Sequence, residues 1–121
     1  MDDNEARARL QTLRDEFAVT VSALQQRLSQ PEREATGDVA VVDQHPADTA
    51  TETAERELDV SRLAMFEARL GQIDDAFVRL RQGAYGTCID CGQPIPEERL
   101  ALLADTPYCV KDAQREQSRL Q

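Results

Sequence analysis

The sequence of 121 residues contains few aromatic residues, no tryptophan, one histidine and only three cysteines. Because aromatic side chains make up just 4% of the chain, we do not expect a large compact core. The length instead fits one small domain, or a small core with an extended arm. An odd number of cysteines fits a bound metal in a reducing compartment better than a framework of disulfides.

The sequence also has little positive charge. It has 14 basic residues against 23 acidic ones and a net charge of −9. This balance argues against a protein that mainly binds DNA phosphates and favours one that binds a basic surface. No stretch approaches the roughly 20 apolar residues of a membrane span, and the charged start lacks the apolar region of a signal peptide. We therefore expect a cytoplasmic protein that uses neither a membrane nor a specific DNA sequence as its partner.

The usual signatures of an active site are missing as well. The chain has no phosphate-binding glycine loop, and it offers no Ser/His/Asp or Cys/His set with an orienting partner. Its single histidine, His45, stands far along the chain from the cysteines. We expect no enzymatic activity.

Two apolar series at steps of three and four residues predict two long amphipathic helices. If the helices run antiparallel, the members pair so that each pair of residue numbers sums to 90, for example Phe17 with Ile73 and Leu24 with Phe66. This register puts a turn near residue 45, where Pro46 suits the first position of a helix. Pro31 and Gly37 predict a break between residues 31 and 45. The two series are Leu10, Leu13, Phe17, Val21, Leu24, Leu28 and Leu63, Phe66, Leu70, Ile73, Phe77, Leu80.

The three cysteines and one aspartate form a pattern of metal-ligand spacing, C-x2-C-x17-C-x2-D. Cys88 and Cys91 have the spacing of a zinc knuckle, and the glycine that follows them allows the turn this needs. We expect Thr106 and Pro107 to begin a helix that brings Cys109 and Asp112 to one face. A carboxylate is an accepted zinc ligand, so Asp112 is our candidate for the fourth position.

Other interpretations of the cysteine site remain open. Three cysteines and a water molecule could complete the site, or a metal-free finger could be held by apolar packing alone. An incomplete zinc site would leave reactive thiolates, so thiol-based redox sensing is a further possibility. A thioredoxin-like dithiol fits poorly, because no βαβ pattern surrounds the two-residue spacing.

These features together resemble the DksA/TraR family of bacterial transcription factors. The resemblance rests on "HPADTA" at the hairpin turn, "YGTCIDCG" at the finger, Arg99 and Leu100 between the cysteine pairs, and the seventeen-residue gap. It implies a mainly α fold: a long antiparallel coiled-coil hairpin on a small zinc-finger base with a C-terminal helix. We accordingly expect residues 1–83 to form the hairpin arm, with its tip near 43–50, and residues 84–121 to form the base.

The resemblance also implies a function. Members of this family bind RNA polymerase directly and insert the hairpin tip into its secondary channel, where acidic tip residues modulate initiation. Asp48 and Ala50 match the second aspartate and the alanine of the family's tip, while His45 stands in place of the first aspartate. The resemblance further implies one structural zinc ion. His45 as a plain turn residue and Asp48 as a helix cap are the alternatives.

Some family members also use basic residues to bind guanosine tetraphosphate. The corresponding positions here are Gln72, Leu103 and Ala113, so we do not predict this ligand.

Two other functions stay open: a helical zinc-knuckle module that binds another protein, and a thiol or zinc redox sensor. Because an intramolecular hairpin buries both apolar series, we expect a monomer.

Overall fold

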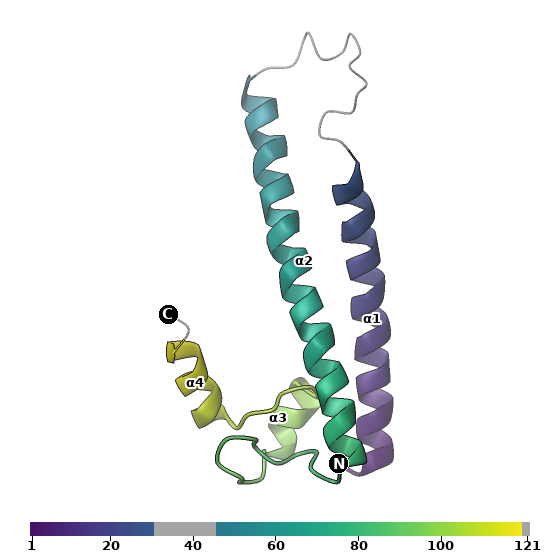
Figure 1. The fold of residues 1–121 in the computed structure, drawn as a ribbon, viewed down its shortest axis with the longest axis vertical. Coiled ribbons are helices and arrows are strands. Elements are labelled where there is room, and N and C mark those ends of the chain that lie inside the picture. Colours follow the sequence, from purple (N-terminus) through teal and green to yellow (C-terminus); the bar gives the residue numbers. More distant parts are fainter. Residues whose placement is uncertain (31–45, 120–121) are drawn as a thin grey trace. The chain divides into compact units, whose positions relative to one another are not determined.

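The computed structural model describes residues 1–30 and 46–119, with side chains from 1–30 and 50–119. Its elements are α1 (Asp3–Ser29), α2 (Pro46–Arg81), α3 (Glu97–Leu102) and α4 (Val110–Arg119). The two long helices α1 and α2 pack antiparallel, as Figure 1 shows. The predicted mainly α fold, with a helix pair, a cysteine-bearing base and a C-terminal helix, is confirmed.

The apolar series form the seam between α1 and α2. Every member of both series is buried or half-buried; the buried Ala6 lies one turn before Leu10, and the buried Ala76 lies between Ile73 and Leu80. α2 begins at Pro46, as predicted, because the fixed φ of proline suits a first helical position. Asp48 therefore lies inside the first turn of α2, and the alternative that it is the N-cap is wrong.

The register of the seam differs from the symmetric pairing about residue 45. The ring of Phe17 lies edge-on against that of Phe66, with 5.3 Å between centroids, whereas the symmetric pairing put Leu24 opposite Phe66. Two aromatic rings gain from edge-to-face contact beyond their buried area, so their interaction favours this pairing. The steps of three and four residues predict which residues form the seam, but they do not predict which residue of the other helix each large side chain contacts.

The chain divides into two compact units. One contains residues Met1–Glu16 and Arg69–Gln121, and the other contains Phe17–Ala68. The first unit holds the finger and the base of the helix pair; the second holds the remainder of the described arm. The predicted division at residue 83 stays a prediction.

The base is organised by a small apolar cluster and one buried ion pair. Cys88, Ile95 and Leu100 are buried together, and two tyrosines pack against them. Beside this cluster, the Arg69 guanidinium donates two hydrogen bonds, of 2.7 and 2.8 Å, to the buried carboxylate of Asp105. This pair joins α2 to the segment that follows α3.

The start of α4 differs from the sequence prediction. Thr106 and Pro107 do not begin the helix; α4 starts at Val110, directly after Cys109. The Thr106 hydroxyl instead bonds the Tyr108 backbone, and Arg99 donates to the Tyr108 carbonyl at 2.9 Å. These bonds hold residues 106–108 in a turn, so the helix begins one turn later. The Cys109 carbonyl still accepts the first bond of α4, from the Ala113 N–H at 2.9 Å.

Candidate metal centre

A tight backbone turn positions the first two cysteines. The Cys88 N–H donates to the Gln93 carbonyl at 2.8 Å, and the Gly92 N–H donates to the Cys88 carbonyl at 3.0 Å. Gly92 has a φ of 75°, a conformation that residues with a side chain rarely adopt. The glycine thus lets the chain turn back so that both cysteines face one point.

A second backbone bond joins the two halves of the site. The Ile89 N–H donates to the Pro107 carbonyl at 3.0 Å, which ties the knuckle to the segment that leads into Cys109. Cys109 precedes α4 and Asp112 lies in its first turn, so both reach the knuckle from the same helix end. Sequence spacing alone gave no sign of the Ile89–Pro107 bond.

The four predicted ligands converge. One sulfur or oxygen atom from each of Cys88, Cys91, Cys109 and Asp112 lies within 4.8 Å of all the others. Oδ2 of Asp112 accepts from the Cys88 thiol at 3.0 Å and from the Cys109 thiol at 3.3 Å. The Cys91 and Cys109 sulfurs are 3.9 Å apart.

These separations suit a tetrahedral zinc ion. With a Zn–S bond of about 2.3 Å, two sulfurs of a tetrahedral site lie about 3.8 Å apart, and a sulfur and an oxygen lie somewhat closer. Three thiolates and one carboxylate are a donor set that zinc accepts. The residues present therefore fit a structural zinc ion with only small adjustments.

Burial is uneven across the site. Cys88 and Asp112 are almost fully buried, at 1% and 3% exposure, whereas Cys91 is exposed. Hydrogen bonds from Cys88, and also from Cys91 and Cys109, lower the pKa of Asp112 to about 2 in the metal-free protein. The reciprocal bond with Asp112 raises the pKa of the Cys91 thiol to about 12. Without metal, the Asp112 carboxylate therefore carries a negative charge and the Cys91 thiol keeps its proton.

Polar groups around the ligands support them. Burial and the bond to Asp112 raise the pKa of the Cys88 thiol, but backbone N–H groups of Cys91, Cys109 and Asp90 donate to its sulfur and lower that pKa on balance. The guanidinium of Arg115 lies 3.7 Å from Oδ1 of Asp112, which leaves Oδ2 facing the thiols. Such outer contacts orient ligands and tune affinity, and sequence reasoning missed Arg115 although it stands one helical turn after Asp112.

The residues predicted for the hairpin tip are only partly visible. His45 lies outside the described residues, and the side chain of Asp48 does as well. Ala50 is exposed in the second turn of α2. Their contact with polymerase stays a prediction.

The three positions considered for an anionic ligand share one cavity of the base. Gln72, Leu103 and Ala113 line about 220 Å³ together with Arg69, whose guanidinium is bound to Asp105. The cation of this cavity is thus already paired with a carboxylate. The expectation that the cavity does not take guanosine tetraphosphate stays a prediction.

Comparison with known proteins identifies the finger. Residues 83–117, which contain all four candidate ligands, match the family described as the prokaryotic dksA/traR C4-type zinc finger. The finger of this chain is therefore similar to the zinc finger of the DksA/TraR family. The family's finger is of the C4 type, whereas the cluster in this chain combines three cysteines with Asp112.

A solved structure extends the similarity of this chain beyond the finger. The transcription factor DksA2 from Pseudomonas aeruginosa superposes with a TM-score of 0.70 and 25% identity, covering 97% of this chain and 84% of that one. The predicted architecture and the predicted resemblance to the DksA/TraR family are therefore both confirmed.

Two curated relatives are uncharacterised. One, from Aquifex aeolicus, is 45% identical over 47 residues, which is 39% of this chain and 32% of that protein. The other is YteA of Bacillus subtilis, 37% identical over 67 residues, which is 55% of this chain and 28% of that protein. The matched part thus spans about a third of the length of these relatives. Within the part of the chain that the structure describes, no helix combines the length and apolar character of a membrane span.

Proposed function

We propose that this protein is a transcription regulator that binds RNA polymerase and inserts its helix-pair tip into the secondary channel. The observation that carries the proposal is the likeness to a transcription factor across nearly the whole chain, arm and finger together. A finger alone would fit many partners. An antiparallel helix pair on such a finger, with α2 starting at Pro46, fits far fewer.

The charge of the chain agrees with this role. An acidic protein, at −9, suits a channel that leads to magnesium ions and basic side chains. Asp48 in the first turn of α2 is the proposed acting group, because a carboxylate can perturb metal coordination or a hydrogen bond there without taking part in bond making. His45 would bring a neutral or cationic ring to the same region, and Ala50 would lie two residues further along α2.

We further propose that the four-residue cluster of the base holds one structural zinc ion. Cys88, Cys91 and Cys109 would supply thiolates and Asp112 one carboxylate oxygen. Bound zinc joins the knuckle to the start of α4 and so fixes the base from which the helix pair extends. The ion has no catalytic part in this proposal, and we propose no enzymatic activity for the chain.

The test is binding of the purified, zinc-analysed protein to bacterial core RNA polymerase, in competition with a probe lodged in the secondary channel. We expect displacement of the probe at micromolar concentration or below. Asp48→Asn should keep this binding and lose the effect on open-complex lifetime. Glu67→Gln, which removes an exposed carboxylate from the middle of α2, is the matched control and should keep both. Absence of binding by a folded protein would refute the proposal and favour a helical module for another partner.

A second function is favoured by one observation, the exposure of Cys91 beside Cys109. With 3.9 Å between their sulfurs, these two thiols can form a disulfide when a peroxide takes their two electrons and is reduced to water. Loss of these ligands would release zinc. Reversible release under mild peroxide would support a thiol sensor, whereas zinc retained through the same treatment would exclude it.

A further inference from the structure

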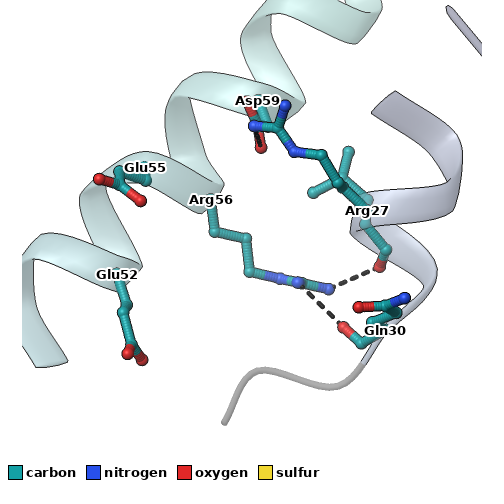
Figure 2. A pocket seen from close by; sticks show the side chains of 7 residues that line it. Arg27, Gln30, Glu52, Glu55, Arg56 and Asp59 are labelled. Atoms are coloured by element: carbon teal, nitrogen blue, oxygen red, sulfur yellow. Dashed lines mark hydrogen bonds and ion pairs between the residues drawn. The ribbon is translucent and has the colours of Figure 1, made fainter. Parts of the chain in front are cut away.

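A set of polar contacts links α1 to α2 where the seam has few apolar residues. Arg27, in the last turn of α1, bonds the Asp59 carboxylate of α2 at 2.5 Å. Arg56 of α2 reaches in the opposite direction and donates to the Leu28 carbonyl at 2.7 Å and the Gln30 carbonyl at 3.2 Å. Figure 2 shows both arginines crossing between the helices. We refer to Arg27, Arg56 and Asp59 as the clasp.

The Arg56 contacts have a clear physical reason. The last carbonyls of a helix have no partner within the helix, and the negative end of the helix dipole lies there. A guanidinium supplies both a positive charge and several donors, so it binds one of these carbonyls, that of Leu28, together with the Gln30 carbonyl just after the helix. Arg56 thus adds to the cap that the chain itself supplies, in which the Ser29 hydroxyl donates to the Gln26 carbonyl and the Gln30 N–H to the Arg27 carbonyl.

At this level the seam positions of α2 are occupied by the polar residues Arg56 and Asp59, although Leu28 of α1 is half-buried. Leu58 and Val60, which flank Asp59, are 47% and 54% exposed. Asp59 itself is only 6% exposed, and its Oδ1 accepts no hydrogen bond, although the Arg62 guanidinium lies 3.6 Å away. A buried carboxylate with an unsatisfied oxygen is a poor source of stability. Buried polar pairs between helices are better known for fixing register.

We propose that the clasp is a positioning device that fixes the first turns of α2 against the end of α1. α2 is one continuous helix from Pro46, and Asp48 lies about 12 Å from Arg56 along its axis. A slip or rotation at the clasp is therefore transmitted directly to Asp48 and Ala50. This inference rests on the proposed function, because it assigns to Arg56 and Asp59 the placement of the tip within polymerase.

The experiment compares Arg56→Gln and Arg56→Lys with Arg14→Gln. Lysine keeps a cation and donors at position 56, whereas glutamine removes the charge. Arg14→Gln is the matched control because Arg14 forms an exposed ion pair of 3.0 Å with Asp74, also between α1 and α2. Three quantities are measured for each: probe displacement from polymerase, open-complex lifetime, and hydrogen exchange of the amides in residues 51–56.

We expect the substitution at Arg56 to change the effect on open-complex lifetime without changing the binding to polymerase. Arg56→Gln should displace the probe as well as the wild type does, while the amides of residues 51–56 exchange faster. Its effect on open-complex lifetime should be about tenfold smaller than that of the wild type. Arg56→Lys should recover most of that effect, and Arg14→Gln should match the wild type in all three.

Two results would overturn the proposal. Unchanged exchange in Arg56→Gln would mean that the clasp does not order α2. Faster exchange with a full regulatory effect would mean that it does not position the tip. If the wild type itself fails to displace the probe, the proposed function fails and the positioning role falls with it, while the exchange data still report on the clasp as a structural contact.

Discussion

The ion pair of Arg69 and Asp105 gives the sharpest prediction about stability. Asp105 is buried, with 2% of its side chain exposed, and receives two charge-assisted hydrogen bonds from one guanidinium. The bond to Asp105 raises the pKa of Arg69, and a guanidinium stays charged near neutral pH even without that partner. Asp105→Asn keeps the shape of the side chain and removes its charge, which leaves the guanidinium facing a neutral amide.

The magnitude follows from the burial of the two partners. Breaking a buried ion pair by removing one partner typically costs about 3–5 kcal/mol. The Arg69 side chain is 32% exposed and can recover some hydration, so we expect the lower end of that range, about 3 kcal/mol. For a domain of this size, such a loss lowers the melting temperature by about 10 °C.

The assay is thermal unfolding followed by circular dichroism, with zinc removed from both proteins so that metal binding does not mask the difference. Asp74→Asn is the matched control: its pair with Arg14 is half-exposed on both sides and should contribute less than about 1 kcal/mol. If Asp105→Asn and Asp74→Asn melt within about 2 °C of each other, the reasoning from burial is wrong.

Three further predictions concern the metal centre. Asp112→Asn should lower zinc affinity by at least about tenfold in a chelator competition, whereas Asp112→Cys should keep or raise it; equal affinity of all three proteins would show that position 112 is not a ligand. Because the Cys91 thiol has a pKa of about 12 without metal, zinc must displace its proton to bind near neutral pH. Calorimetry in two buffers of different ionisation enthalpy should therefore show proton release. The affinity for zinc should also fall as the pH is lowered. The lowered pKa of Asp112, about 2 in the folded metal-free protein, stabilises the fold above the ordinary carboxyl pKa, and this contribution is lost as the pH falls from about 4 to about 2. Acid titration of metal-free Asp112→Asn should lack that component, and identical acid titrations would contradict it.

The fold was predictable because its main signals are local. Steps of three and four residues locate the seam, Pro46 marks the start of α2, and two-residue spacings bring each pair of candidate ligands together. These patterns depend only on helix and turn geometry, which neighbouring residues determine.

The parts that the sequence did not predict depend on contacts between distant residues. The pairing of Phe17 with Phe66 depends on the size of two side chains, which a symmetric count of positions ignores. Arg69 with Asp105, and Arg27 with Asp59, are separated by 36 and 32 residues and carry no periodic signal. The later start of α4 also follows from a non-local contact, since Arg99 holds the turn before it.

The bond between the Ile89 N–H and the Pro107 carbonyl has a consequence for how the metal site assembles. Seventeen residues separate Cys91 from Cys109, and bringing the ends of such a loop together costs entropy. The backbone bond closes this loop through residues that are not ligands. The ligands are therefore close together before a metal ion binds, so less of the binding free energy is spent on closing the loop. If the proposed zinc ion is released, we expect this bond to keep the ligands close enough for the ion to be taken back without refolding of the chain.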